Sequence, residues 1–406
     1  MTRLLVRGLE QIATPAGASG PLRGQAFGEV DLVEHGFVLC ADGLVEALGP
    51  MRELPAVDGD VVEIDARGLC AVPGLVDCHT HPAFGGNRVA EFDLRAGGAG
   101  YEELHAAGGG ILATVEATRA AAASGDLAAI VERHSEWMLA RGTTTWEGKS
   151  GYGLDRETEV ASLEAVAEAG GIPTWLGAHA VPPEFPDADG YLDFALSEVL
   201  PEVAGIASAA DVFLERGAFD AGQARRYLGA CRAAGLALRL HADQFTESGG
   251  IELAVELRAR SVDHLEATGP QGVAVLAASD VAAVLLPVAA LVLGRPMPPG
   301  RALADAGAIV ALATDFNPGS AFCESLPLVC SLACAGVGLT PAQALAACTV
   351  NAAYVLGLDD RVGRLRPGHP ADIVLLDAPD WRYVAYHLGG EVVATVIKGG
   401  RVVWER

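Results

Sequence analysis

The stretch PGLVDCHTH, residues 73–81, determines which fold this chain adopts. An apolar run over residues 71–76 ends in two histidines, His79 and His81, which are two positions apart. Side chains at positions i and i+2 of a strand point to the same side, so both imidazoles are expected to face one point. An open doubly wound sheet would usually carry a Gly-rich phosphate turn after its first strand, and this strand ends in DCHTH instead.

Seven further short apolar runs follow this one. They cover residues 143–147, 172–177, 211–214, 236–240, 261–263, 282–286 and 309–314. Between most of them lie Ala-, Leu-, Glu- and Arg-rich stretches with helical spacing, such as 156–169 and 220–234. Eight strand–helix repeats are typical of a (β/α)₈ barrel. We therefore expect residues 70–356 to form an α/β fold of the TIM-barrel type.

The two ends of the chain differ from this centre. Residues 1–69 and 357–406 contain Val-, Ile- and Leu-rich runs separated by Gly, Pro and Asp, as in LLVRG near the start and VVATVIKGG near the end. Such runs are strand signals. We expect both ends together to form one small β-sandwich domain beside the barrel.

The charge excludes two classes of partner. The chain has 406 residues, and 28 Lys and Arg against 52 Asp and Glu give a formal net charge of −24. A nucleic acid backbone or an anionic membrane surface attracts a basic stripe, which this sequence lacks. With 51% hydrophobic and 20% charged residues, the chain has enough apolar side chains for a large core.

The apolar segments and the cysteines suggest a cytoplasmic protein. The longest apolar stretch, residues 281–294, contains Pro287 and is shorter than the roughly 18 residues of a membrane-spanning helix. The first residues lack the apolar run of a secretory signal. The eight cysteines form no CxxC pair, so we expect reduced thiols that pack as small hydrophobic side chains.

Polar side chains recur where the predicted strands end. In chain order they are His79 and His81, Glu147 and Lys149, His179, Glu215, His241, His264 and, after the eighth run, Asp315. Barrel enzymes carry their chemistry at the carboxyl ends of the strands. We therefore expect these side chains to meet at one mouth of the barrel.

Four of these residues form a donor set suited to one zinc or iron ion: His79, His81, His241 and Asp315. Water bound to such a metal ionises near pH 7 and becomes a nucleophile. Asp315 is suited to shuttle the proton to a leaving nitrogen, and His264 to hold the water or polarise a carbonyl. This set predicts hydrolysis of a C–N bond. Taken singly, His179 or His264 could be a structural histidine, and Asp315 could cap a helix.

Several longer segments resemble a known family. PGLVDCHTH, HAD at 241–243, DH at 263–264 and ATD at 313–315 resemble the amidohydrolase superfamily. More specific segments resemble its imidazolonepropionase family, which acts in histidine degradation. They are residues 84–115, TTWEGKSGYGL (144–154), LGAHAVPPEF (176–185), DVFLERGAF (211–219), HADQF (241–245), SVDHLE (261–266) and ALATDFNPGSAF (311–322).

This resemblance implies hydrolytic opening of 4-imidazolone-5-propanoate to N-formimidoyl-L-glutamate by a homodimeric enzyme with a single Zn²⁺ or Fe³⁺ ion. It implies that metal hydroxide attacks the ring carbonyl, that Asp315 shuttles the proton, and that His179 and His264 stabilise the oxyanion. The implied metal ligands are His79, His81, His241 and Asp315. The implied substrate contacts are Arg88, Tyr152, His179, Gln244, Asn317, Gly319 and Ser320.

The residue types agree with a small anionic heterocyclic substrate. An arginine fork such as that of Arg88 binds a carboxylate, and the two-sided amide of Gln244 can recognise a ring N–H and a carbonyl. Tyr152 can offer its hydroxyl group or its ring face, and Tyr101 is a weaker candidate in the same loop region. The backbone N–H groups of NPGS, residues 317–320, could bind an anion.

Lys149 and the reaction type leave alternatives. Some amidohydrolases bridge two metals with a carbamylated lysine on strand four, but Lys149 follows the second predicted strand. We therefore expect one metal and an unmodified Lys149 that makes an ion pair inside the barrel mouth. The same metal site could serve a deaminase of a small heterocycle, although a neutral base would not need Arg88. The third alternative is an inactive barrel used as a scaffold.

Overall fold

The structure is a computed structural model that describes residues 3–57, 59–98 and 110–406. Its centre is a sheet of parallel strands in sequential order. These strands are β6 (Leu75–Asp77), β7 (Thr143–Lys149), β8 (Ile172–Ala178), β9 (Ala209–Leu214), β10 (Ala237–Ala242), β11 (Ser261–His264), β12 (Ala282–Leu285) and β13 (Val310–Leu312). A parallel bridge between Thr80 and Phe316 joins the last strand to the first. The predicted (β/α)₈ barrel is confirmed.

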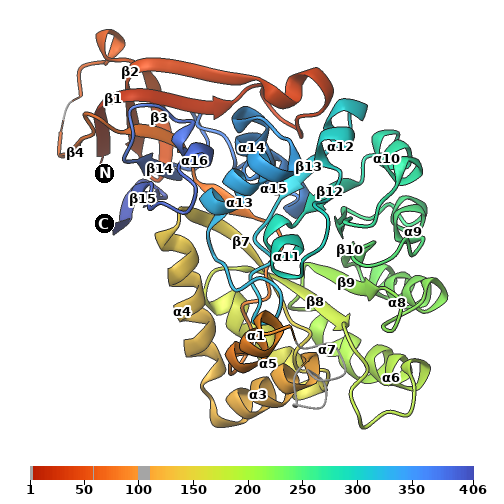
Figure 1. The fold of residues 1–406 in the computed structure, drawn as a ribbon. Coiled ribbons are helices and arrows are strands. Elements are labelled where there is room, and N and C mark those ends of the chain that lie inside the picture. Colours follow the sequence, from red (N-terminus) through yellow and green to blue (C-terminus); the bar gives the residue numbers. More distant parts are fainter. Residues whose placement is uncertain (1–2, 58, 99–109) are drawn as a thin grey trace.

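Helices follow the barrel strands, and most of them lie around the outside of the sheet (Figure 1). They are α1 (Val89–Ala96), α3 (Ile111–Ser124), α4 (Leu127–Ala140), α5 (Arg156–Glu168), α6 (Ala188–Phe194), α7 (Leu200–Val203), α8 (Ala221–Ala233), α9 (Gly250–Glu256), α10 (Pro270–Ala277), α11 (Pro287–Val292), α12 (Gly300–Ala306), α13 (Leu326–Leu332), α14 (Pro341–Ala347) and α15 (Val350–Leu356), with π-helical turns η3 (Ala195–Val199) and η4 (Ala333–Val337). Local caps set some boundaries. Asp220 accepts from the backbone N–H of Gln223 while the Gln223 side chain accepts from that of Asp220, which forms a capping box at the start of α8.

The terminal segments form a second, mixed sheet, and the two ends of the chain lie together on it (Figure 1). Its strands are β1 (Arg3–Pro15), β2 (Val30–Ala41), β3 (Leu44–Pro50), β4 (Val61–Asp65), β5 (Cys70–Pro73), β14 (Ile373–Leu376), β15 (Val393–Lys398) and β16 (Arg401–Glu405), and the short helices η1 (Gly24–Gly28), η2 (Met51–Glu53) and α16 (Tyr383–Tyr386) lie in the same terminal segments.

The sheet branches at β1, so that β2 and β3 lie on one side of this strand and β4, β5 and β14 lie on the other. One edge of β1 pairs with β2, and the other pairs first with β4 and then with β5. The register shifts between Arg7 and Leu9 at Gly8, whose φ of 77° lies in the region that favours glycine. Leu4, Val38 and Ile373, from β1, β2 and β14, share one buried cluster. Strands on both sides of β1 therefore contribute to the core of the small β domain.

The structure divides the first apolar run, which was predicted to form a single barrel strand over 71–76. Residues Cys70–Pro73 form β5 and pair with β1 and β14, and only Leu75–Asp77 enter the barrel as β6. Gly74 lies at the crossing, where a Cβ atom would come within 2.2 Å of the Thr144 hydroxyl oxygen. The chain changes sheets here because glycine allows this close approach.

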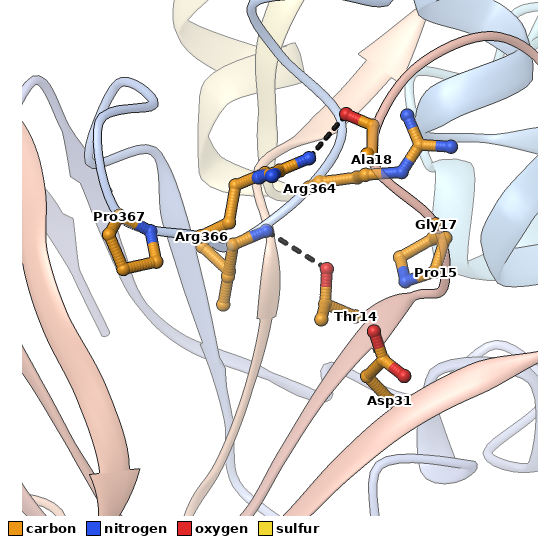
Figure 2. Close-up of a pocket in the computed structure, with 9 residues that line it drawn as sticks. Thr14, Pro15, Gly17, Ala18, Asp31, Arg364, Arg366 and Pro367 are labelled. Atoms are coloured by element: carbon orange, nitrogen blue, oxygen red, sulfur yellow. Dashed lines mark hydrogen bonds between the residues drawn. The ribbon is translucent and has the colours of Figure 1, made fainter.

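Two arginines of the 364–367 loop donate hydrogen bonds to the turn after β1 (Figure 2). A cavity of about 350 Å³ lies beside these contacts. Arg364 is only 3% exposed and donates to the carbonyls of Ala16 and Gly20. Arg366 donates to the carbonyl of Ala18, and the backbone N–H of Leu365 donates to the Thr14 hydroxyl. These contacts hold the turn after β1 against the segment that enters β14.

In the described part of the chain, no helix is both long enough and apolar enough to cross a membrane. All eight cysteines are free.

Candidate metal centre and active site

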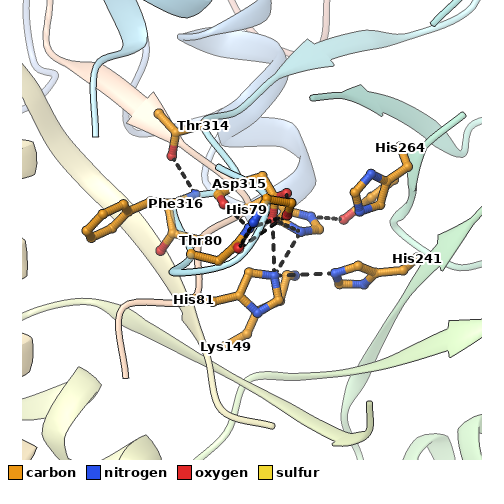
Figure 3. A network of polar contacts seen from close by, with 12 residues as sticks. His79, Thr80, His81, Lys149, His241, His264, Thr314, Asp315 and Phe316 are labelled. Atoms are coloured by element: carbon orange, nitrogen blue, oxygen red, sulfur yellow. Dashed lines mark hydrogen bonds and ion pairs between the residues drawn. The ribbon is translucent and has the colours of Figure 1, made fainter. Parts of the chain in front are cut away.

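Two overlapping groups of possible metal ligands meet at the carboxyl ends of the barrel strands: His79 with His81 and His241, and His79 with His264 and Asp315 (Figure 3). His79 and His81 follow β6, His241 lies in β10, and Asp315 follows β13. Nε2 of His81 lies 3.3 Å from Nε2 of His79 and 3.4 Å from Nε2 of His241. Asp315 Oδ1 lies 3.4 Å from His79 Nε2 and 3.3 Å from His81 Nε2. All four side chains are at most 3% exposed.

Four of the six separations among His79, His81, His241 and Asp315 are those expected around one metal ion. Ligands about 2.0–2.1 Å from a tetrahedral ion lie about 3.3–3.4 Å from one another, which matches the four separations above. The donor chemistry agrees. His79 Nδ1 lies 2.6 Å from Asp263 and His241 Nδ1 lies 3.0 Å from Asp211. A carboxylate there retains the proton on Nδ1 and leaves the Nε2 lone pair free for a metal.

Burial and mutual contacts shift the pKa values of these groups. Burial lowers the pKa of His79 well below its usual value and also lowers the pKa of His81. Burial alone would raise the pKa of Asp315, but its contacts with the imidazoles of His79 and His81 outweigh burial and hold that pKa well below its usual range. Neutral imidazoles and an ionised carboxylate are the forms that bind metal.

Strained backbone marks the same strand ends. Asp243, His264, Leu265 and Asp315 have φ values of 54°, 86°, 72° and 56°. Such conformations cost non-glycine residues roughly 1–3 kcal/mol each and tend to cluster at functional sites. The barrel therefore holds these side chains toward the mouth at a cost in stability.

His264 and His179 lie beside the metal-binding group, and their surroundings shift their pKa values in opposite directions. Burial would lower the pKa of His264, but the carboxylate of Glu266, 3.4 Å from its Nδ1, raises it. His264 is therefore suited to donate a hydrogen bond. Burial lowers the pKa of His179 well below its usual value, and its Nδ1 donates to the Gly151 carbonyl at 2.9 Å. Neutral His179 thus presents Nε2 to the pocket as an acceptor.

A pocket of about 420 Å³ opens above the metal-binding group. Most of the predicted residues line it: His81, His241, Asp315, His264, His179, Arg88, Tyr152, Gln244, Asn317, Gly319 and Ser320. Sequence reasoning missed Glu91, Arg95, Phe213, Phe245 and Leu293, which also line it. Tyr101 lies outside the described residues. His79 is fully buried beneath the pocket.

Arg88 reaches the pocket already paired. Its Nε and Nη2 donate to the Glu91 carboxylate at 2.8 and 2.5 Å. Its Nη1 lies 2.3 Å from the position that a Cβ atom on Gly319 would occupy. The Glu91 carboxylate also accepts from the backbone N–H of Gly110 at 2.8 Å. Glu91 therefore fixes the guanidinium with its Nη1 directed toward Gly319.

The NPGS turn differs from its prediction as an anion site. The backbone N–H groups of Gly319 and Ser320 both donate to Asn317 Oδ1 at 2.8 Å. These donors are therefore used within the turn, because the short asparagine side chain competes for them. The turn instead supports Asp315. The Ser320 hydroxyl lies 3.4 Å from Asp315 Oδ2, and the Asn317 amide donates to the Asp315 carbonyl at 2.6 Å.

The predicted ion pair of Lys149 is confirmed. Its ammonium group lies 2.8 Å from both Glu147 and Asp211, inside the barrel. Glu215, at the exit of β9, accepts from the backbone N–H groups of Phe245 and Thr246. It therefore anchors the loop after β10, which carries Gln244.

A barrel of this type with a His, His, His, Asp group at its mouth defines a metal-dependent hydrolase of the amidohydrolase class. The sequence profile of the amidohydrolase family matches residues 70–403. The chain is 58% identical to the imidazolonepropionase of Rubrobacter xylanophilus over 98% of both chains. It is 46% identical to that of Deinococcus radiodurans, over 98% of this chain and 99% of that protein. The chain therefore belongs to the imidazolonepropionase family of amidohydrolases.

More distant solved structures share the fold. Guanine deaminase from Escherichia coli superposes with a TM-score of 0.69 at 17% identity and covers 100% of both chains. Guanine deaminase from Bradyrhizobium japonicum superposes with a TM-score of 0.71 at 16% identity, also over 100% of both chains. Identities this low support the architecture alone.

Proposed function

We propose that this protein hydrolyses 4-imidazolone-5-propanoate to N-formimidoyl-L-glutamate in histidine degradation. The observation that carries the proposal is 58% identity over 98% of the chain to an imidazolonepropionase. The pocket adds independent support, because it combines a metal-binding group with an arginine suited to an anionic substrate.

His79, His81, His241 and Asp315 would hold one metal ion. When bound, the ion acts as a Lewis acid and lowers the pKa of water near it. Asp315 is suited to accept the proton of an attacking water molecule and to pass it to the ring nitrogen as the C–N bond breaks. Ser320 and Asn317 hold Asp315 in place for this transfer.

His264 and His179 would act on opposite polar groups of the substrate. His264, with Glu266 beside it, would donate a hydrogen bond to the oxygen that becomes negative when the ring carbonyl is attacked. His179, whose Nδ1 is bound to the Gly151 carbonyl, would accept a ring N–H at Nε2. This assignment separates two residues that the sequence placed in one role.

Arg88, Tyr152 and Gln244 would select the substrate. Nη1 of Arg88 would bind the propionate carboxylate, because the other edge of the guanidinium holds Glu91. Burial raises the pKa of Tyr152, so its phenol stays neutral and can donate. Gln244 is 7% exposed and makes no hydrogen bond within the described part of the chain, which leaves its amide for the ring.

The alternative, deamination of a neutral heterocycle on the same site, has less support. Three deaminases that superpose on this chain are 17%, 18% and 16% identical to it. A neutral base also gives no role to the cationic Arg88 and Arg95 at the pocket wall.

A direct assay separates these reactions. Purified protein is mixed with enzymatically generated imidazolone propionate, the loss of ultraviolet absorbance is followed, and the product is identified by mass. We expect one N-formimidoyl-L-glutamate per substrate and no release of ammonia. Ammonia release from a heterocycle panel, with imidazolone propionate left intact, would support the deaminase.

Further properties complete the proposal. We propose Zn²⁺ or Fe³⁺ as the metal, because imidazole and carboxylate ligands accept both, and metal analysis of the purified protein decides between them. We also propose a cytoplasmic homodimer with no nucleic acid or membrane partner. Light scattering would test the dimer, and cell fractionation would test the location.

A further inference from the structure

A cluster of buried ionic side chains fills the barrel beneath the metal-binding histidines. Glu147 and Lys149 of β7, Asp211 of β9, Arg239 of β10 and Asp263 of β11 are each at most 2% exposed. Barrel interiors are mainly filled by branched apolar side chains, and buried ions need partners. None of the five lines the substrate pocket. A role in contacting substrate therefore does not explain them.

Lys149 links the parts of this cluster. Its Nζ lies 2.8 Å from Asp211 Oδ2 and 2.8 Å from Glu147 Oε1. Arg239 Nη1 lies 2.9 Å from the same Glu147 oxygen. The other oxygen of Asp211, Oδ1, lies 3.0 Å from His241 Nδ1. An unbroken series of contacts thus runs from Lys149 through Asp211 to His241.

Asp211 orients His241 only if its own carboxylate is fixed. Within the described part of the chain, its ion-pair partners are His241 and Lys149. The cluster contains three carboxylates and two permanent cations. Removal of the Lys149 charge would leave Asp211 without its fixed cation in a buried site, which favours a rearranged carboxylate.

We propose that Lys149 is a positioning residue of the metal centre. Its unmodified ammonium group holds Asp211, and Asp211 holds His241 with Nε2 toward the metal, so Lys149 sets metal affinity and geometry without touching substrate. Carboxylates that bind metal-ligating histidines typically alter metal affinity by 10–100-fold when they are changed. The inference rests on the proposed metal site and extends it to a residue one contact further away.

The first test compares Lys149→Met with a matched control. Methionine keeps the length and removes the charge. Arg364→Met removes another buried cation, 3% exposed, which donates to the carbonyls of Ala16 and Gly20 and not to the metal-binding histidines or to the ionic cluster. Zn²⁺ affinity is measured by competition with a chromophoric chelator, and ligand geometry from the visible spectrum of the Co²⁺-substituted protein. We expect Lys149→Met to bind Zn²⁺ 10–100-fold more weakly, with shifted Co²⁺ bands, and Arg364→Met to stay within twofold of wild type.

The second test asks whether Lys149 acts through Asp211. In an Asp211→Asn background, Lys149→Met should change Zn²⁺ affinity by less than twofold, because the relay is already broken. If Lys149→Met does not fold by circular dichroism, Lys149→Gln, which keeps a donor, replaces it and should retain part of the affinity.

Two outcomes overturn different claims. A folded Lys149 variant with wild-type Zn²⁺ affinity and Co²⁺ spectrum refutes the positioning role alone. A wild-type protein that binds neither ion refutes the metal centre itself.

Discussion

Replacement of Arg88 by alanine tests how the pocket holds an anionic substrate. Glu91 occupies Nε and Nη2 of Arg88 at 2.8 and 2.5 Å, so the substrate carboxylate is expected to gain one charge-assisted hydrogen bond, from Nη1. Such a bond contributes about 1.5–3 kcal/mol. Because about 1.4 kcal/mol corresponds to a factor of ten, KM should rise roughly 10- to 150-fold. The contact is the same in the ground and transition states, so kcat should change little.

A second variant separates the loss of the Arg88 hydrogen bond from repulsion between Glu91 and the substrate carboxylate. Arg88→Ala leaves the Glu91 carboxylate with only the Gly110 N–H and Arg95, 4.0 Å away, as partners at the pocket wall, where it would repel the substrate carboxylate. Arg88→Ala combined with Glu91→Gln removes both charges and should still show at least a tenfold higher KM in the ultraviolet assay. A double variant with KM within twofold of wild type would refute the carboxylate clamp.

Four other changes test separate parts of the site. Gly319→Ala places a Cβ atom 2.3 Å from Arg88 Nη1, so KM should rise severalfold in the same assay, and an unchanged KM would mean that Nη1 does not bind substrate. His241→Ala should contain less than about a tenth of a metal per chain and lose turnover, because a ligand is missing; full metal content would exclude His241 as a ligand. His264→Ala should keep its metal but lose roughly a hundredfold or more in kcat, the typical effect of removing an oxyanion donor, and loss of metal would instead make it a ligand. Treatment with a chelator should abolish activity and added Zn²⁺ or Fe³⁺ should restore it; activity that persists after metal removal would contradict the mechanism.

The barrel and its donor set were predictable because each is encoded locally. Short apolar runs alternate with helical spacing, and the polar side chain after each run lies at a strand end. His79, His81, His241 and Asp315 could therefore be found without knowing their separations. The split of residues 71–76 between two sheets could not be predicted, because β5 and β6 form one apolar run interrupted only by Gly74.

The supporting side chains were hidden because their roles depend on tertiary contacts. Asp211 and Asp263 lie within apolar strands, and an acid in such a place indicates a buried partner but does not identify it. Glu91 resembles an ordinary helical surface residue until its contact with Arg88 is known. The sequence of the NPGS turn does not reveal that the Asn317 side chain accepts from the N–H groups of Gly319 and Ser320. The tautomer of His179 likewise depends on the Gly151 carbonyl.

The most direct test of the metal centre is an anomalous-diffraction map of the purified, metal-loaded protein at the absorption edge of its metal. One peak per chain is predicted, about 2.0–2.2 Å from Nε2 of His79, His81 and His241 and from a carboxylate oxygen of Asp315. A peak bound by other side chains, or two peaks sharing Lys149, would contradict a single ion held by these four residues.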